Sequence, residues 1–142
     1  MRFLFSIICI LQLLGLSNSA DCTLHDLQHY EHRVFSQNGE DGILLEILRN
    51  IGITNKKYVE FGVQDGFECN SRILRETMGF SGVMFDGGYS NPQIGLHQEY
   101  ITMSNIIQLF EKYNVPKIFD MLTIDTDMFD WWILSRILID GI

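Results

Sequence analysis

The hydrophobic positions from residue 38 onward alternate between a helical spacing and short continuous runs. Residues 43–51 carry apolar side chains three and four positions apart, which predicts a helix that Asn38 caps and Gly52 ends. Short apolar runs predict buried strands at 58–61, 83–85 and 121–124, with a weaker strand at 99–102. Strands that alternate with helices predict right-handed crossovers and a parallel sheet.

Three further helices complete this alternation. The first follows Asn70 as its predicted cap and ends at Gly79, and the second opens at Ser104 and stops before Pro116. The third follows residue 127 and is expected to bury Trp132, Ile133, Ile137 and Leu138. The predicted fold class is therefore α/β, with parallel strands flanked by helices.

Residues 1–20 have the pattern of a secretory signal peptide. Arg2 precedes an apolar run over 3–16, and the small residues of 17–20 offer a cleavage site near Ala20. A membrane anchor is the alternative, but the apolar run is shorter than the ~20 residues that a spanning helix needs. We therefore expect residues 21–142 to form a mature domain in the secretory pathway, secreted or lumenal, with no stable membrane span.

Composition narrows the function classes. The chain has 142 residues, 46% of them hydrophobic, and a formal net charge of −8, which argues against a disordered chain and against an electrostatic nucleic-acid binder. Cys22 and Cys69 would remain after signal cleavage. They can form at most one disulfide, and a bridge between them and free thiols are equally compatible with the sequence.

Polar residues gather where the predicted strands end. In an open parallel sheet, ligands bind at the carboxyl ends of the strands. Gly62 and Gly66 would let the backbone approach a ligand closely, and Asp86, about twenty residues further on, is placed to bind a ribose. Glu60 and Asp65 make this loop acidic, and 60–66 contains no Lys or Arg. The loop therefore favours a cationic cofactor over a pyrophosphate and points to S-adenosylmethionine, whose methionine end Glu60 and Asp65 would face.

Four ordered motifs resemble those of the FkbM-like class I methyltransferases, more narrowly an uncharacterised eukaryotic branch of that family. They lie at 36–42, 58–70, 82–87 and 122–127. The resemblance implies a Rossmann-like methyltransferase sheet and transfer of a methyl group from S-adenosylmethionine to an oxygen of a carbohydrate-like or other small hydroxylated acceptor. It implies cofactor roles for Glu60, Gly62, Asp65 and Asp86, with Ser36, Gln37 and Glu40 near the same mouth.

Direct in-line displacement of the methyl group would need a base for the acceptor hydroxyl. Asp125 and Asp127, which follow the last predicted strand, are our candidates for that base or for orienting the hydroxyl. Many relatives in the resembled family have a glycine shortly after this strand, and this chain has Met128 and Phe129. Such sheets also have about seven strands, so the four strands predicted here indicate that the C-terminal half is missing and the last strand has an uncovered edge.

Two other functions use the same residues differently. Asp125-Thr126-Asp127 would coordinate Mn²⁺ or Mg²⁺ in a glycosyltransferase, although the same acids, with Asp130, would also offset the dipole of the following helix. A secreted binding module without turnover is the third hypothesis. The methyltransferase hypothesis, which we favour, predicts no metal site.

Overall fold

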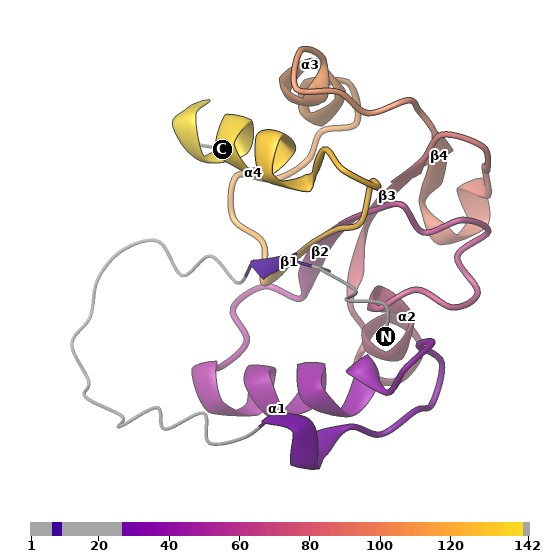
Figure 1. Ribbon diagram of the computed structural model, residues 1–142, viewed down its shortest axis with the longest axis vertical. Helices are drawn as coiled ribbons and strands as arrows, with labels where there is room; N and C mark the ends of the chain where they lie inside the picture. Colours follow the sequence, from indigo (N-terminus) through magenta and orange to yellow (C-terminus); the bar gives the residue numbers. More distant parts are fainter. Residues whose placement is uncertain (1–6, 10–26, 141–142) are drawn as a thin grey trace.

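The computed structural model describes residues 7–9 and 27–140, which form an α/β fold (Figure 1). Four strands run parallel in the order β5-β2-β3-β4, with helices between them. The alternation of strands and helices read from the sequence is therefore confirmed. The strands are β2 (Lys57–Phe61), β3 (Ser81–Asp86), β4 (Leu96–Gln98) and β5 (Met121–Ile124), and the α-helices are α1 (Glu40–Ile51), α2 (Ser71–Met78), α3 (Ile106–Lys112) and α4 (Asp130–Asp140).

The sheet has a fifth strand from the N-terminal part of the chain. β1 (Ile7–Cys9) pairs antiparallel with β5, with Ile7 opposite Ile124 and Cys9 opposite Leu122. The edge of β5 that was expected to be uncovered is therefore paired here. β1 falls within the predicted signal peptide, and the predicted cleavage site near Ala20 lies outside the described residues, so signal processing stays a prediction.

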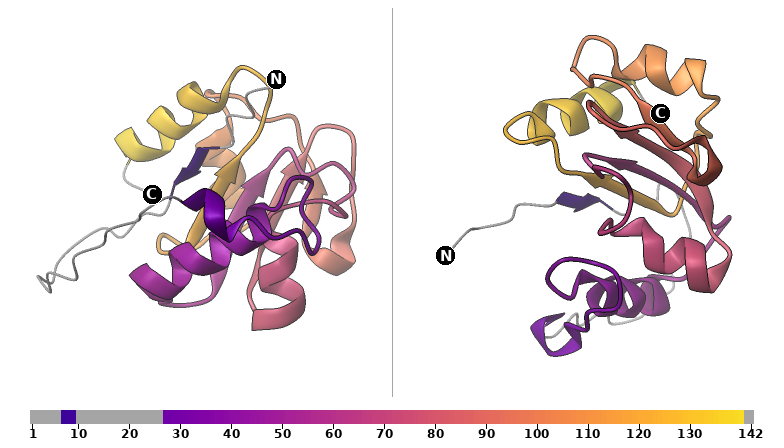
Figure 2. Two further views of the ribbon diagram at one scale, coloured as in Figure 1. Left: turned by 60° about the horizontal axis from the view of Figure 1, so that its bottom comes forward. Right: turned by 90° about the vertical axis from the view of Figure 1, so that its right-hand side faces the viewer.

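Helices cover both faces of the sheet, α1 and α2 on one and α3 and α4 on the other (Figure 2). Alternating side chains of β2 pack against the two helix layers, because successive residues of a strand point to opposite faces. Tyr58 packs with Leu44 and Leu74 of the first layer, and Val59 and Phe61 pack with the second. Both clusters contain fully buried side chains, so the sheet is held in a two-sided core.

The two predicted asparagine caps are not formed. Gly39 precedes α1 with a positive φ of 98°, and the backbone N–H and side-chain amide of Asn38 both donate to Glu40. At α2, the side chain of Asn70 makes no capping bond, because the carboxylate of Glu60 accepts the first backbone N–H groups instead. At α2 a carboxylate, which binds N–H donors more strongly than an amide oxygen, therefore takes the cap's role, whereas at α1 the hydroxyl of Ser36 accepts the backbone N–H of Asp41.

The third parallel strand and the surroundings of α4 differ from the sequence-based expectation. β4 covers Leu96–Gln98 and not 99–102, because fully buried Leu96 pairs with Met84 while Glu99 begins the loop. α3 begins at Ile106, two residues after Ser104. In α4, Ile133 and Ile137 are buried as expected, but Trp132 is 56% and Leu138 45% exposed, so their predicted core positions were wrong.

The strand order creates one point where the chain reverses its direction of travel across the sheet. From β2 the chain moves outward to β3 and β4, and then crosses back to place β5 on the other side of β2. Ligands of doubly wound sheets bind at such a switch point, outside the carboxyl ends of the two strands. Here those ends are Phe61 and Ile124, which pair in register.

Candidate functional site

A cavity of about 710 Å³ opens at the carboxyl ends of β2, β3 and β5. Its size is in the range of small-molecule sites. Seven of its fifteen lining residues carry a carboxylate, and none of these described residues is Lys or Arg. The lining includes Gln37, Glu40, Glu60, Gly62, Asp65, Asp86, Asp125 and Asp127 among the residues singled out from the sequence, but not Ser36 or Gly66.

Gly62 lies at the switch point, where the loop after β2 meets the end of β5. Its backbone has a φ of +75°, and its N–H donates to the carbonyl of Phe85 over 2.9 Å. A Cβ atom at this position would lie 1.7 Å from the carbonyl oxygen of Asp125. Gly62 is thus required for the close approach of two backbones, a structural need that applies whether or not a ligand is bound.

The carboxylate of Glu60 is committed to the start of α2. Its two oxygens accept the backbone N–H groups of Asn70 and Ser71, each over 2.9 Å, and the residue is only 2% exposed. These hydrogen bonds favour the ionised carboxylate, but burial outweighs them and raises the pKa of Glu60. Glu60 lines the cavity, but both of its carboxylate oxygens already hold the start of α2, so it has fewer lone pairs to offer a ligand.

Asp86 holds two loops at the mouth. Its carboxylate accepts the backbone N–H of Gln64 over 2.7 Å and that of Gly88 over 2.8 Å. Each oxygen retains a further lone pair for a hydroxyl donor. Asp65 is an exposed turn residue whose carboxylate accepts the N–H of Phe67, and Gly66 completes that turn with a φ of +78° away from the cavity lining.

The segment before α1 supplies the opposite wall of the cavity. Gln37 is exposed in the lining, and Glu40 stands at the first residue of α1. Burial of Glu40 opposes ionisation, but hydrogen bonds from its own backbone and from Asn38 outweigh burial and lower its pKa. Ser36 is buried next to this segment, where its hydroxyl accepts the N–H of Asp41, and it does not line the cavity.

Asp125 and Asp127 form the third side of the cavity. Burial raises the pKa of Asp125, and the negative charges of Asp130 and Asp127 raise it further. The carboxylate of Asp130 accepts the backbone N–H and hydroxyl of Thr126, both over 2.7 Å, and so shapes the loop. Asp127 is exposed and has a φ of 48°, and Met128 follows with a φ of 91°, a region that favours glycine.

A second, apolar pocket of about 490 Å³ was not anticipated from the sequence. Tyr100 packs near Gly87, the residue after Asp86, with 3.6 Å from its ring to the position of a Cβ on that glycine. Phe129, two residues beyond Asp127, also lines the apolar pocket. Phe80 and Phe85 are buried in the core and offer no ring face to a ligand, whereas Phe67 is exposed. The lining residues are Tyr100, Ile101, Thr102, Met103, Ser104, Phe129 and Trp132.

Two alternatives raised by the sequence concern cysteine and metal chemistry. Cys69 is free and buried, with its thiol 3.3 Å from the carbonyl of Gly66, and Cys22 lies outside the described residues. Within residues 7–9 and 27–140, no three His, Cys, Asp or Glu side chains are grouped so that they could hold a metal ion. Over the same ranges, no helix is both long and apolar enough to cross a membrane.

Comparisons of the chain with protein-family models, with curated proteins and with solved structures give no match.

Proposed function

We propose that the protein binds S-adenosylmethionine at the carboxyl ends of β2, β3 and β5 and transfers its methyl group to a hydroxyl of a small or carbohydrate-like acceptor in the secretory pathway. The observation that carries this proposal is the cavity at the switch point, where seven carboxylates and no Lys or Arg among the described residues line the opening. A cavity of this charge disfavours the phosphates of a dinucleotide and favours a ligand with a sulfonium and an ammonium group.

The donor set fits such a ligand in its polar parts. Asp86 keeps lone pairs free for the two hydroxyls of a ribose, even while it accepts the N–H groups of Gln64 and Gly88. Asp65 and Glu40 present carboxylate oxygens to the same cavity and would pair with an ammonium group. Glu60 adds negative charge beneath them while it anchors α2.

The apolar pocket would take the base of the same ligand. It begins at Tyr100, next to Gly87 and hence beside the carboxylate proposed for the ribose. Trp132 and Phe129 offer exposed aromatic rings in the pocket, and stacking of a base on an aromatic side chain contributes ~1–3 kcal/mol. An acidic cavity and an aromatic pocket lined by residues close in the chain to Asp127 would match a cationic amino acid joined to a nucleoside.

S-adenosylmethionine would supply an electrophilic methyl group at this site. The chain's own part in the chemistry would be to hold the acceptor and to take up the proton of its hydroxyl. Asp125 is suited to that task because burial and the charges of Asp130 and Asp127 raise its pKa toward the working range of a general base. Asp127, exposed at the rim, is placed to orient the acceptor.

The test is the binding of S-adenosylhomocysteine to the full chain in the presence of a chelator, measured by thermal shift and fluorescence quenching. We expect stabilisation that needs no metal ion. Trp132→Ala should weaken binding about tenfold, because it removes a stacking surface. Trp131→Ala is the matched control: its side chain is 63% exposed on the same helix but does not line the pocket, and its affinity should be that of the wild type.

A metal-dependent glycosyltransferase predicts the reverse pattern. In that case a nucleotide sugar with Mn²⁺ would stabilise the chain, the chelator would abolish the effect, and S-adenosylhomocysteine would have none. Asp127→Asn would then abolish the metal-dependent stabilisation, whereas under our proposal it leaves S-adenosylhomocysteine binding intact and lowers turnover.

A binding module without turnover is the second candidate, and one observation favours it. α4 exposes Trp131, Leu138 and Ile139 on its surface, the kind of apolar display that interaction surfaces carry. This candidate shares the ligand site but predicts that S-adenosylmethionine stays unconverted. Mass spectrometry of the bound fraction, after incubation with hydroxylated acceptors, separates it from an active methyltransferase.

A further inference from the structure

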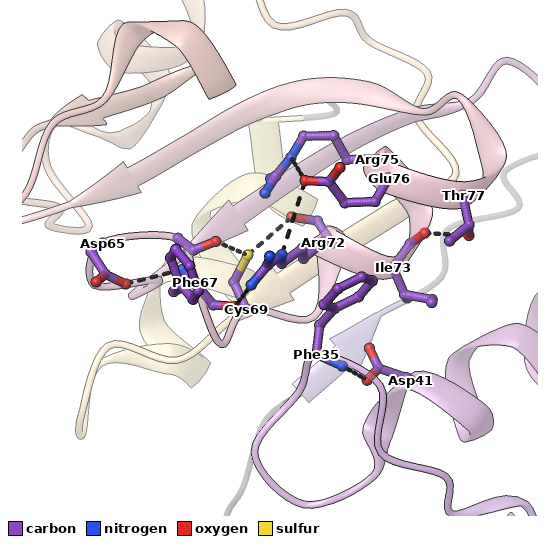
Figure 3. A network of polar contacts seen from close by, with 12 residues as sticks. Phe35, Asp41, Asp65, Phe67, Cys69, Arg72, Ile73, Arg75, Glu76 and Thr77 are labelled. Carbon is purple, nitrogen blue, oxygen red and sulfur yellow. Dashed lines mark hydrogen bonds and ion pairs between the residues drawn. The ribbon is translucent and has the colours of Figure 1, made fainter.

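Two loops that are far apart in the sequence are joined behind the wall of the acidic cavity. The first, residues 33–37, leads to Gln37, and the second, residues 63–70, carries much of the cavity lining. Between them stands Arg72 of α2, whose guanidinium lies 4.4 Å from the ring centroid of Phe35 and 4.4 Å from that of Phe67 (Figure 3). One side chain thus contacts both loops at once.

The edge of the same guanidinium makes polar contacts. Its Nη1 donates to the carbonyl oxygen of Phe67 over 2.7 Å, and its Nε lies 3.9 Å from a carboxylate oxygen of Glu76. A second link runs parallel to it, since Arg33 pairs with Glu68 over 2.9 Å. Phe67 is 65% exposed apart from this contact, so no hydrophobic core holds its ring in place.

Arginine has the geometry that this arrangement needs. Its planar group can stack an aromatic ring on each face while its N–H groups donate within the plane, whereas the ammonium of lysine is a compact point charge. The positive charge of Arg72 is turned toward two rings and a carbonyl, and Arg72 is absent from the lining of the cavity. It therefore adds no basic side chain to the lining of the opening.

We propose that Arg72 is a positioning residue: it fixes the 33–37 and 63–70 loops against each other and thereby sets the wall of the cofactor cavity. This inference rests on the proposed function for the identity of the ligand. α2 is well placed for the task, because Glu60 on the cavity floor binds its first N–H groups and Arg72 follows in its first turn.

The experiment compares the full wild-type chain with Arg72→Lys by amide hydrogen exchange without ligand and by calorimetric titration with S-adenosylhomocysteine. We expect the hydrogen-bonded amides of Ser36 and Gly66 to exchange about tenfold faster in the variant, and the Kd to rise about tenfold. Melting should change by only a few degrees. Arg49→Lys is the matched control, because Arg49 is exposed on α1 and touches neither loop, and it should behave as wild type.

The outcomes separate the two claims. Unchanged exchange in either loop overturns the inference, and so does faster exchange with an unchanged Kd, since the loops would then be joined without setting the site. If the wild type itself fails to bind S-adenosylhomocysteine, the proposed function fails and the exchange rates alone decide whether Arg72 joins the loops. Should Arg72→Lys not fold, Phe35→Leu removes one ring and must give the same pattern in 33–37 and 63–70.

Discussion

Gly62 and Asp125 approach each other so closely that a Cβ atom on Gly62 would lie 1.7 Å from the carbonyl oxygen of Asp125. The contact joins the loop after β2 to the end of β5 at the switch point of the sheet. The obstructing atoms belong to the backbone, so no side-chain rotation can relieve the overlap.

Gly62→Ala should therefore destabilise the protein by roughly 3 kcal/mol or more, because it combines a backbone overlap with a positive φ. Gly79→Ala is the matched control: its φ is also positive, +70°, but a Cβ there meets nothing within 4 Å. That control should lose only ~1–2 kcal/mol. Urea denaturation of both variants measures the difference, and equal losses would refute the overlap.

Met128 has the opposite property, since a bulky side chain occupies a position suited to glycine. It has a φ of 91°, and its side chain is 88% exposed and thus has little packing to lose. Met128→Gly should stabilise the protein by up to ~1 kcal/mol, after allowance for the greater freedom of glycine in the unfolded chain. Met128→Ala removes the same side chain without freeing the backbone. A melting temperature raised equally in both variants would show that backbone strain is not the cause.

The charge of Asp125 should depend on its neighbours. Burial raises its pKa first, and Asp130 and Asp127 add to the rise, so Asp127→Asn should lower the pKa of Asp125. Carboxyl-carbon NMR titration measures this directly. Because the folded pKa lies above the unfolded value, Asp125 lowers stability as pH rises between the two. Binding of a cationic ligand should weaken as pH falls through the raised pKa, and an affinity independent of pH there would count against Asp125 as a contact.

Cys69 should be inert in the folded protein. Burial, and after it the charge of Glu60, raise its pKa to about 11, so little thiolate exists at pH 8. Alkylation followed by peptide mapping should leave the peptide of Cys69 unmodified in buffer and modified in urea. Rapid labelling of this peptide in buffer would mean that the 63–70 loop opens.

Much of the fold was predictable because local patterns and packing agree in it. β5 covers the same residues as the predicted strand, and β2 and α1 each differ by one residue at their start, since continuous apolar runs and helical spacing are strong local signals. The acids of the cavity were also predictable. In a parallel sheet the residues that follow each strand converge at one edge, which brings Asp86 and Asp125 into the same lining as Gly62.

The remaining features depend on contacts between distant residues. Nothing near Asn70 in the sequence indicates that Glu60 will replace its side chain as the cap, because the two meet only once the sheet forms. The apolar pocket joins Tyr100 to Trp132 across α3 and β5, and its rings look like ordinary core positions in the sequence. Pairing of Ile7 with Ile124 spans nearly the whole chain, beyond the reach of any local pattern.

The most direct test of the central claim is a calorimetric titration of the full chain with S-adenosylmethionine, carried out on the wild type, Asp86→Asn and Glu111→Gln. Asp86→Asn should weaken binding by at least tenfold, because a charged acceptor contributes ~1.5–3 kcal/mol to a hydrogen bond. Glu111→Gln removes an equal charge from exposed α3, away from both pockets, and should bind as the wild type does. We predict saturable heat in the wild type and in Glu111→Gln, with an affinity at least tenfold lower in Asp86→Asn alone. A folded wild-type chain that gives no heat would contradict the proposed binding of S-adenosylmethionine.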